Sequence, residues 1–367
     1  MRVLMVADAR SVHTRRWAVS LAGAGVEIVL FSIFPSPDDF FENHCIRLEV
    51  YDLFTYKKEH GLRSFRSMCV RHYAAVRRLK SLIKMFCPDI LHAHYATSFG
   101  LIGALTGFHP FIVSVWGSDV YEFPEQSSIN RLSVKFILNK ADKVLSTSNI
   151  MARRTALFTS VPISVTPFGV DTVLFSRIPV KQDGTFVVGN VKTLSPKYGI
   201  DVLIRSFKSI REHNPELKTV LTIVGEGPCR AEYERLAEDL GIREYVLFVG
   251  KVSNDRLPQY YNSFSVSVSL SLSESFGVVA VEAMSCGCPV VVSDADGFTE
   301  VVEDGVTGYI VPKGNPDAAA SAIQHFIDNP SLRESMGAAG RARVEQFYDW
   351  NDNVRTMMKI YGDVRKS

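Results

Sequence analysis

The sequence predicts an α/β protein of two domains that opens on a doubly wound parallel sheet. The opening is a βαβ unit, with a strand at Val3–Ala7, a helix from about Arg15 to Ala24 and a strand at Glu27–Ser32. A second sheet begins halfway along the chain, at Phe186–Asn190. The length of 367 residues suits two ordinary domains.

The composition is typical of a soluble globular protein. Hydrophobic residues make up 46% of the chain and the net charge is +2, so we expect no general affinity for nucleic acid. The six cysteines lack metal-type spacing, and Cys286 and Cys288 stand closer than a redox pair. We find no signal peptide and no membrane-spanning run, and we expect a cytoplasmic protein with reduced thiols.

Chemistry-bearing side chains follow the first strand, where doubly wound sheets bind ligands. The loop lacks the paired glycines of a dinucleotide fingerprint, which argues against a nicotinamide site. A solvated basic loop is the equal alternative. The polar residues of this stretch are Asp8, Arg10, Ser11, His13, Arg15 and Arg16.

Two further strands, Asp89–Tyr95 and Phe111–Val115, also lead into polar loops, the second of them Trp116–Asp119. His92 and His94 are two residues apart on a strand, so their side chains point to one face. No carboxylate or cysteine pattern accompanies them, and we therefore expect no metal.

A basic stretch extends from Lys57 to Lys84, with Glu59 as its one acid. Its apolar residues recur at helical spacing, which predicts an amphipathic helix. Such a helix can lie on an anionic membrane, so a peripheral membrane contact through Lys57–Lys84 is one prediction. The favoured alternative is a core helix with a solvated basic face.

In the second half, Lys192 and Lys197 lie in a loop before a helix expected from Asp201 to about His213. Two lysines before a helix N-terminus can clamp phosphate groups. The alternative is that both are simply exposed to solvent, as lysines usually are.

Two more strands follow, at Thr219–Val224 and Tyr245–Val249. The first ends in a turn with Gly225 and Gly227, which alone is a weak signal, and the second leads to Val252. Helical patterns then cover Pro316–Asn329, Leu332–Phe347 and Asn351–Val364.

The strongest chemical signal lies between two short strands late in the chain. We expect a strand at Ser265–Ser271, a helix capped by Ser273 or Ser275 and running to about Cys286, and a strand at Cys288–Val292. Glu274 and Glu282 are eight positions apart, which on a helix would place them on one face, about 12 Å apart.

A carboxylate suits a vicinal diol, and a helix N-terminus suits a phosphate, so this stretch outlines a nucleotide-sugar site. The alternative makes Glu274 a first-turn helix acid and Glu282 a surface residue. The apolar neighbours of Glu282 argue against that alternative, because a buried acid needs a partner.

The segment from Glu274 to Glu282 resembles the two-glutamate signature of retaining GT-B glycosyltransferases, in glycosyltransferase family four. The resemblance covers nearly the whole chain and is strongest from Val161 to Pro312. It continues through Gly287–Asp294, Gly297–Glu300 and Asp304–Gly308.

The resemblance implies the GT-B fold: two Rossmann-like doubly wound domains facing across a cleft, with the C-terminal helix crossing back to the first domain. Residues 1–168, with the crossing helix 350–367, would form the acceptor-side domain. Residues 169–349 would form the nucleotide-sugar-binding domain. The sequence Asp294-Ala-Asp296 is interpreted as a turn, and we expect neither a metal nor any cofactor beyond the donor substrate.

The resemblance also implies roles for individual residues. Trp116 stands where many members have a histidine, and Lys192 stands in for an arginine. The catalytic residues would be Glu274, Lys197 and Lys192. The donor-binding residues would be Glu282, Phe276, Gly277, Val278, Gly225, Gly227 and Val252. The acceptor-side residues would be Ser11, His13, Arg16, His94, Trp116 and Asp119.

The expected activity is transfer of a hexose-type sugar, with retention, from a nucleotide-diphosphate donor to a glycan or lipid-linked acceptor. The expected pathway is synthesis of cell-envelope polysaccharide. Two alternatives stay open: a GT-B nucleotide-sugar epimerase, and a non-catalytic subunit that binds a partner transferase.

Overall fold

The structure is a computed structural model that describes residues 1–52, 65–180 and 183–366, with the side chains of 65–71 left out. Within these ranges no helix is both long enough and apolar enough to cross a bilayer. The first part of the predicted basic stretch, residues 57–64, lies outside the described residues.

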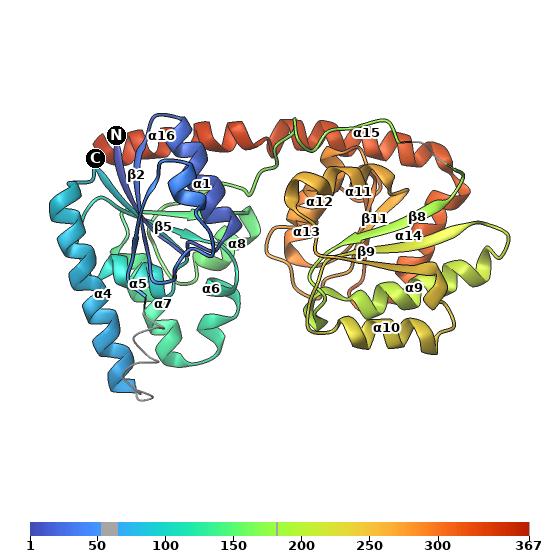
Figure 1. The fold of residues 1–367 in the computed structure, drawn as a ribbon, viewed down its shortest axis with the longest axis horizontal. Helices are drawn as coiled ribbons and strands as arrows, with labels where there is room; N and C mark the ends of the chain where they lie inside the picture. Colours follow the sequence, from blue (N-terminus) through green and yellow to red (C-terminus); the bar gives the residue numbers. More distant parts are fainter. Residues whose placement is uncertain (53–64, 181–182, 367) are drawn as a thin grey trace. The chain divides into compact units, whose positions relative to one another are not determined.

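The chain divides into two compact units (Figure 1). The first comprises Met1–Thr166 and Asn353–Ser367, and the second comprises Pro167–Asp352. The division falls two residues before the boundary expected from the sequence. Each unit is described below by itself.

The first unit contains a seven-stranded parallel sheet in the order β3-β2-β1-β4-β5-β6-β7. Neighbouring strands pair in parallel throughout, as the opening βαβ pattern predicts. The strands are β1 (Arg2–Val6), β2 (Glu27–Ser32), β3 (Arg47–Val50), β4 (Ile90–His94), β5 (Phe111–Val115), β6 (Lys143–Ser146) and β7 (Ile163–Val165).

Helices pack against this sheet, and their buried apolar residues join one core. On α4, Leu79, Leu82 and Phe86 are buried, which supports the core-helix interpretation of this segment. The main helices are α1 (Val12–Gly23), α2 (Phe40–Asn43), α4 (Phe65–Phe86), α5 (Ser98–Ala104), α6 (Ser118–Tyr121), α7 (Ser128–Lys140) and α8 (Asn149–Thr155).

Helix α1 begins earlier than predicted. Ser11 is its N-cap and accepts a hydrogen bond from the backbone N–H of Thr14, so the helix starts at Val12 and not near Arg15. His13 therefore lies on the first turn of the helix, where the sequence predicted a loop.

The second unit contains a six-stranded parallel sheet in the order β10-β9-β8-β11-β12-β13. Two doubly wound parallel sheets confirm the predicted fold class. The strands are β8 (Phe186–Val191), β9 (Thr219–Val224), β10 (Val246–Gly250), β11 (Val266–Ser269), β12 (Val290–Ser293) and β13 (Gly308–Val311). The helices are α9 (Ile200–His213), α10 (Arg230–Asp239), α11 (Leu257–Ser263), α12 (Val278–Ser285), α13 (Asp296–Val301), α14 (Pro316–Asp328) and α15 (Pro330–Phe347).

The helix that carries Glu282 begins later than predicted. Its N-cap is Gly277, at φ 95°, and no side chain caps it, so the predicted capping by Ser273 or Ser275 is wrong. A Cβ on Gly277 would lie 2.7 Å from the ring of Phe298, so α13 leaves room only for glycine. Glu274 consequently lies in the loop before α12, and the predicted spacing on one helix face does not apply.

The last helix, α16 (Trp350–Lys366), contributes its residues from Asn353 onward to the first unit. The buried Tyr361 hydroxyl lies 2.6 Å from Nδ1 of His92 on β4. The Oγ of Ser114 on β5 lies 2.8 Å from the other ring nitrogen, Nε2. One buried side chain thus joins α16 to two central strands.

Tyr361→Phe is expected to destabilise the first unit by about 1–3 kcal/mol, because it leaves a buried imidazole nitrogen without its partner. Urea unfolding followed by tyrosine and tryptophan fluorescence measures the effect. Tyr73→Phe on α4 is the matched control, since that tyrosine is exposed. Equal midpoints for the two variants would contradict this role of the buried hydroxyl.

Candidate active site

The order of strands in the second sheet predicts where a ligand crevice would lie. The chain runs from β8 outward to β9 and β10, then returns to place β11 on the other side of β8. Ligands of such sheets bind beyond the carboxyl ends of the strands where the order reverses. Lys192 directly follows β8, and Glu274 lies in the loop between β11 and α12, so both flank this point.

Lys192 and Glu274 form an ion pair across the crevice. The Nζ atom of Lys192 lies 2.6 Å from Oε2 of Glu274, and their side chains are only 13% and 12% exposed. The same ammonium lies 4.7 Å from the ring centroid of Tyr198. Each charge is therefore compensated by its partner in a site partly withdrawn from water.

Close backbone packing positions the Lys192 loop. Its N–H donates to the carbonyl of Val224 at 2.9 Å. A Cβ on Gly225, at φ 144°, would lie 1.9 Å from the Lys192 carbonyl oxygen, and one on Gly227 would lie 2.3 Å from that of Leu194. The Gly-x-Gly turn thus allows the β9 loop to pack on the β8 loop.

Lys197 lies on the same loop, in the short 3-10 helix Pro196–Tyr198, and is exposed. Its carbonyl accepts a hydrogen bond from Leu272 N, in the stretch that leads to Glu274, at 2.8 Å. The two loops that flank the crevice are therefore joined by backbone as well as by the ion pair. Val252, two residues beyond β10, is half-buried.

Glu282 has a different environment from Glu274. It is 8% exposed on α12, and its Oε2 accepts a hydrogen bond of 2.8 Å from the hydroxyl of Tyr261 on α11. Burial raises the pKa of Tyr261 well above its usual value, and the charge of Glu282 adds to the effect. The surface alternative for Glu282 is wrong, since this acid is buried and paired.

The segment before α12 and the first turn of that helix would contribute backbone groups to the site more than side chains. Phe276 is 1% exposed, and its ring packs against Phe168 and Tyr348, with centroids 6.0 Å and 5.7 Å away. Its side chain therefore belongs to the core. The first N–H groups of α12, from Val278 onward, lie at a helix end where such groups have no partner within the helix.

Sequence reasoning missed two residues of this site. Tyr261 could have been sought as the donor that a buried Glu282 requires, but nothing local to the sequence identifies it. Asn190 on β8 is 1% exposed and donates from Nδ2 to the carbonyl of Val268 on β11 at 2.7 Å. It thus bridges the two strands between which the order reverses.

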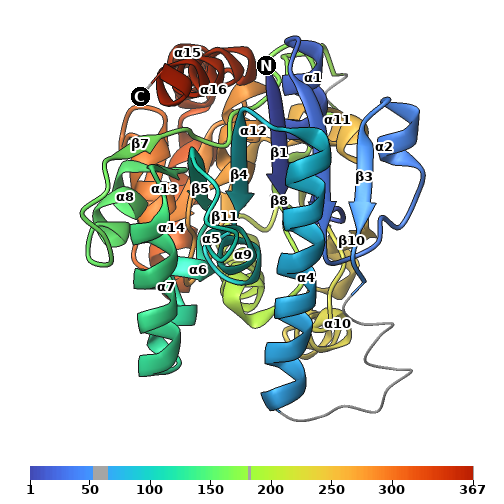
Figure 2. The ribbon, with the colours of Figure 1, turned by 90° about the vertical axis from the view of Figure 1, so that its left-hand side faces the viewer.

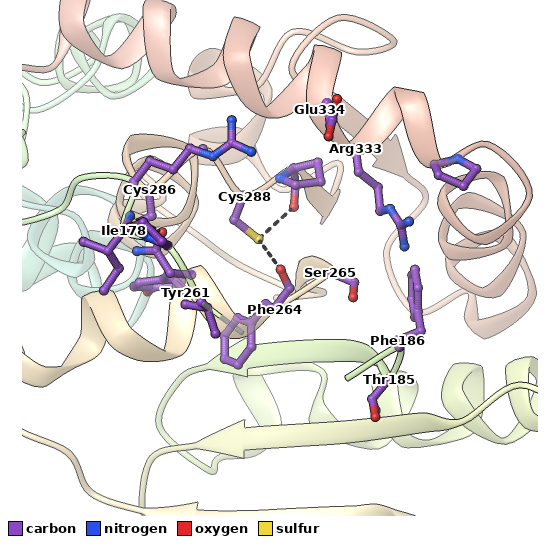
Figure 3. Close-up of a pocket in the computed structure, with 18 of the residues that line it drawn as sticks. Ile178, Thr185, Phe186, Tyr261, Phe264, Ser265, Cys286, Cys288, Arg333 and Glu334 are labelled. Carbon is purple, nitrogen blue, oxygen red and sulfur yellow. Dashed lines mark hydrogen bonds between the residues drawn. The ribbon is translucent and has the colours of Figure 1, made fainter. Parts of the chain in front are cut away.

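A cavity of about 790 Å³ lies at the opposite, amino edge of the second sheet (Figure 3). Its lining includes Phe186 at the start of β8 and Ser265 before β11, and it includes none of the predicted donor residues. Tyr261 lines this cavity too. Burial, followed by the charge of Glu282, raises the pKa of the Cys286 thiol in its wall to about 12.

In the first unit, aromatic rings pack edge-to-face or tilted against one another at the point where the strand order reverses between β1 and β4. The ring centroids of His13 and Trp116 are 5.9 Å apart, and those of Trp116 and His94 are 4.7 Å apart. His94 lies a further 4.5 Å from His92. The structure therefore brings together three of the predicted acceptor-side residues.

The other three predicted acceptor-side residues have structural surroundings. Asp119 is fully buried, and its carboxylate accepts backbone hydrogen bonds from Ala96, Trp116 and Gly117. Burial raises its pKa. Ser11 caps α1, as described above. Arg16 is half-buried on that helix, and its charge adds to the burial that lowers the pKa of His13 to about 4.

Among the residues that the structure describes, no cluster of three or more His, Cys, Asp and Glu side chains could hold a metal ion. Asp294 accepts the backbone N–H of Lys313 at 2.9 Å, and Asp296 begins α13. The Asp294-Ala-Asp296 sequence is therefore part of a turn and a helix start.

Comparison with protein families gives two matches. The model of glycosyl transferases group 1 matches residues 174–343, and the glycosyl transferase 4-like model matches residues 2–148. One curated relative is a D-inositol 3-phosphate glycosyltransferase from Acidothermus cellulolyticus, 29% identical over 319 residues, which are 79% of this chain and 70% of that protein. Another is a GDP-mannose-dependent phosphatidylinositol monomannoside mannosyltransferase from Mycolicibacterium smegmatis, 29% identical, covering 79% of this chain and 80% of that protein.

Solved structures share the fold. A sucrose-phosphate synthase from Thermosynechococcus elongatus superposes with a TM-score of 0.82 at 23% identity, covering 99% of this chain and 98% of that one. Anabaena HepE, solved in complex with UDP, superposes with a TM-score of 0.81 at 20% identity, covering 99% and 100%.

The buried histidines of the first unit predict a pH-dependent stability. Burial lowers the pKa of His92 to about 3, while an unfolded histidine titrates near about 6.5. Below about pH 6.5 the unfolded state therefore binds more protons at this histidine than the folded state does. The contribution of the histidine to the free energy of unfolding is complete above that pH and falls as the pH drops towards 3. The slope is about 1.4 kcal/mol per pH unit for each such histidine.

NMR titration of the histidine rings between pH 8 and 5 measures this directly. The signals of His92 are expected to stay constant across this range, because burial holds its pKa at about 3 in the folded protein. Titration of His92 near pH 6.5 in the folded protein would contradict the assignment. The window above pH 5 keeps most carboxylate titrations out of the comparison.

Proposed function

This chain is a group 1 glycosyltransferase with a family-four-like first unit, and we propose that it transfers a hexose-type sugar from a nucleoside-diphosphate donor to a glycan or lipid-linked acceptor. The observation that carries the proposal is the Lys192–Glu274 pair at the reversal of strand order in the second sheet. The names of the relatives support the substrate classes, since they act on an inositol phosphate and on a phosphatidylinositol mannoside.

The donor would exchange partners with the ion pair. A diphosphate at the crevice offers Lys192 a stronger anion than one carboxylate does, and Lys197 and the first amides of α12 add to the positive potential. Glu274 would then be released to accept hydrogen bonds from hydroxyls of the transferred sugar. Each of the two charges keeps a partner before and after binding, which limits the cost of desolvation.

In the proposed reaction, the bond between the anomeric carbon and the diphosphate oxygen breaks, and a bond to the acceptor oxygen forms. The acceptor proton passes to the departing phosphate oxygen, and Lys192 and Lys197 stabilise the charge that develops there. No protein nucleophile is required. We propose retention of configuration, with a role in cell-envelope polysaccharide synthesis on the cytoplasmic side.

Glu282 would bind the ribose of the donor. Its buried position and its bond to Tyr261 hold the carboxylate in one orientation, which limits the entropy lost on binding. On the first unit, His13, Trp116 and His94 would contact the acceptor. The Nδ1 atom of His94 is buried and has no hydrogen-bond partner among the described residues.

Lys192→Ala is expected to lower kcat/KM by about 100- to 1,000-fold, because it removes a cation from the leaving group and leaves Glu274 unpaired. Transfer from radiolabelled UDP-, GDP- and ADP-sugars, chosen by a thermal-shift screen, gives the measurement. Lys208→Ala is the matched control, since Lys208 also pairs with an acid, Glu212, but on α9. If Lys192→Ala showed wild-type kinetics, Lys192 would have no part in the site. If the wild-type chain converted the donor without any acceptor, an epimerase would be favoured.

Glu282→Ala is expected to weaken donor binding by about 10- to 100-fold, the effect of losing charged hydrogen bonds to a diol. Isothermal titration calorimetry with the selected nucleotide-sugar measures the affinity. Glu303→Ala, which removes an exposed acid of the same unit, serves as the control. Unchanged affinity in a folded Glu282→Ala protein would show that the ribose is held elsewhere.

A further inference from the structure

Three helices form a continuous outer layer on one face of the first sheet. Helix α5 packs against both α4 and α7, so it lies between them (Figure 2). Neither α4 nor α7 contains an aspartate or glutamate, and each carries at least three arginines and lysines. The outer faces of α4 and α7 therefore carry an excess of basic side chains, of which Arg78 pairs with Glu49 and Arg131 with Glu125.

Helix α7 exposes a row of large apolar side chains. Ile129 is 73% exposed, Leu132 is 65% exposed and Phe136 is 41% exposed. They recur at helical spacing and so share one face, while the core is packed by Val134, Ile137 and Leu138 on the other. A row of three exposed apolar residues indicates a surface that meets an apolar partner.

Basic side chains surround this row. Arg131, Lys135 and Lys140 are exposed on α7 itself. On α4, the exposed Tyr73 and Met85 stand among further cations, namely Arg77, Lys80 and Lys84. Exposed apolar residues flanked by cations are typical of a helix that lies in the interface of an anionic membrane.

We propose that the outer face of α4 and α7 docks on an anionic lipid bilayer, with Ile129, Leu132 and Phe136 inserted among the acyl chains. The purpose of this contact rests on the proposed function, because a lipid-linked acceptor presents its sugar at the bilayer surface. A second copy of this chain fits the face less well, since two such surfaces carry the same charge. Nucleic acid also fits the face less well, because its charged phosphate backbone would make no favourable contact with the apolar row.

The position of the face relative to the acceptor-side residues supports the proposal. The loop that carries Trp116 continues through α6 and the 3-10 helix Phe123–Glu125 directly into α7, and that 3-10 helix packs against α7. A bilayer held by α7 would therefore lie close to the acceptor-side loop of the same unit.

Sedimentation with vesicles tests the proposal, using phosphatidylcholine alone or mixed with phosphatidylglycerol, without donor or acceptor. The wild-type chain is expected to bind the mixed vesicles at low salt. The triple change Ile129→Ser, Leu132→Ser and Phe136→Ser is expected to lower the partition coefficient at least about 30-fold. Lys135→Ala with Lys140→Ala is expected to lower it about fivefold per cation.

A matched triple change on the second unit, Val173→Ser, Leu247→Ser and Val306→Ser, removes equally exposed apolar residues and should leave vesicle binding unchanged. The proposal would be overturned if the two triple variants bound the mixed vesicles equally well. It would also be overturned if the wild-type chain bound phosphatidylcholine vesicles as well as it binds the mixed vesicles. Loss of a dimer in light scattering, without loss of vesicle binding, would assign the face to a second copy instead.

Calorimetry of the donor with the same variants separates this proposal from the transferase activity. A folded α7 variant that binds donor normally and has lost vesicle binding supports the docking face. A wild-type chain that transfers sugar to a water-soluble acceptor but never binds anionic vesicles overturns the docking face alone. A chain that binds vesicles but no nucleotide-sugar overturns the proposed function alone.

Discussion

The candidate site depends on one ion pair between residues 82 positions apart, Lys192 and Glu274. The pair forms because β8 and β11 are neighbours at the reversal of the strand order, so the loops that follow them meet. Gly225 and Gly227 permit the β9 loop to pack against the β8 loop, and Asn190 bridges β8 and β11. In such a half-buried pair each charge compensates the other, and either can exchange its partner for a charged ligand.

The two acids that the sequence singled out have different surroundings. Glu274 lies in a loop at the crevice and shares its charge with a lysine. Glu282 lies on a buried helix, where the hydroxyl of Tyr261 satisfies it. That same tyrosine also lines the cavity at the amino edge of the sheet.

The first unit uses buried polar groups to fix its loops. Asp119 gathers three backbone N–H groups from the loops after β4 and β5, which fixes the backbone beside Trp116. His92 joins α16 to the sheet through Tyr361. These contacts leave the rings of His13, Trp116 and His94 together at the carboxyl edge of the sheet, while α4 and α7 present a basic, partly apolar face outside it.

The sequence by itself determined the fold class, most strands and the family resemblance, because alternation, glycine positions and helical periodicity are local signals. The bounds of β2, β5 and β9 were predicted residue for residue, and the burial of Glu282 followed from its apolar neighbours. Tertiary structure alone decided that α12 begins at Val278, after a Gly277 N-cap that packs against the ring of Phe298 and leaves no room for a side chain. Tertiary structure also decided the partners of Lys192 and Glu282, and it decided which apolar side chains of α7 are exposed. The reason is that contacts between distant segments depend on strand order, which no local pattern encodes.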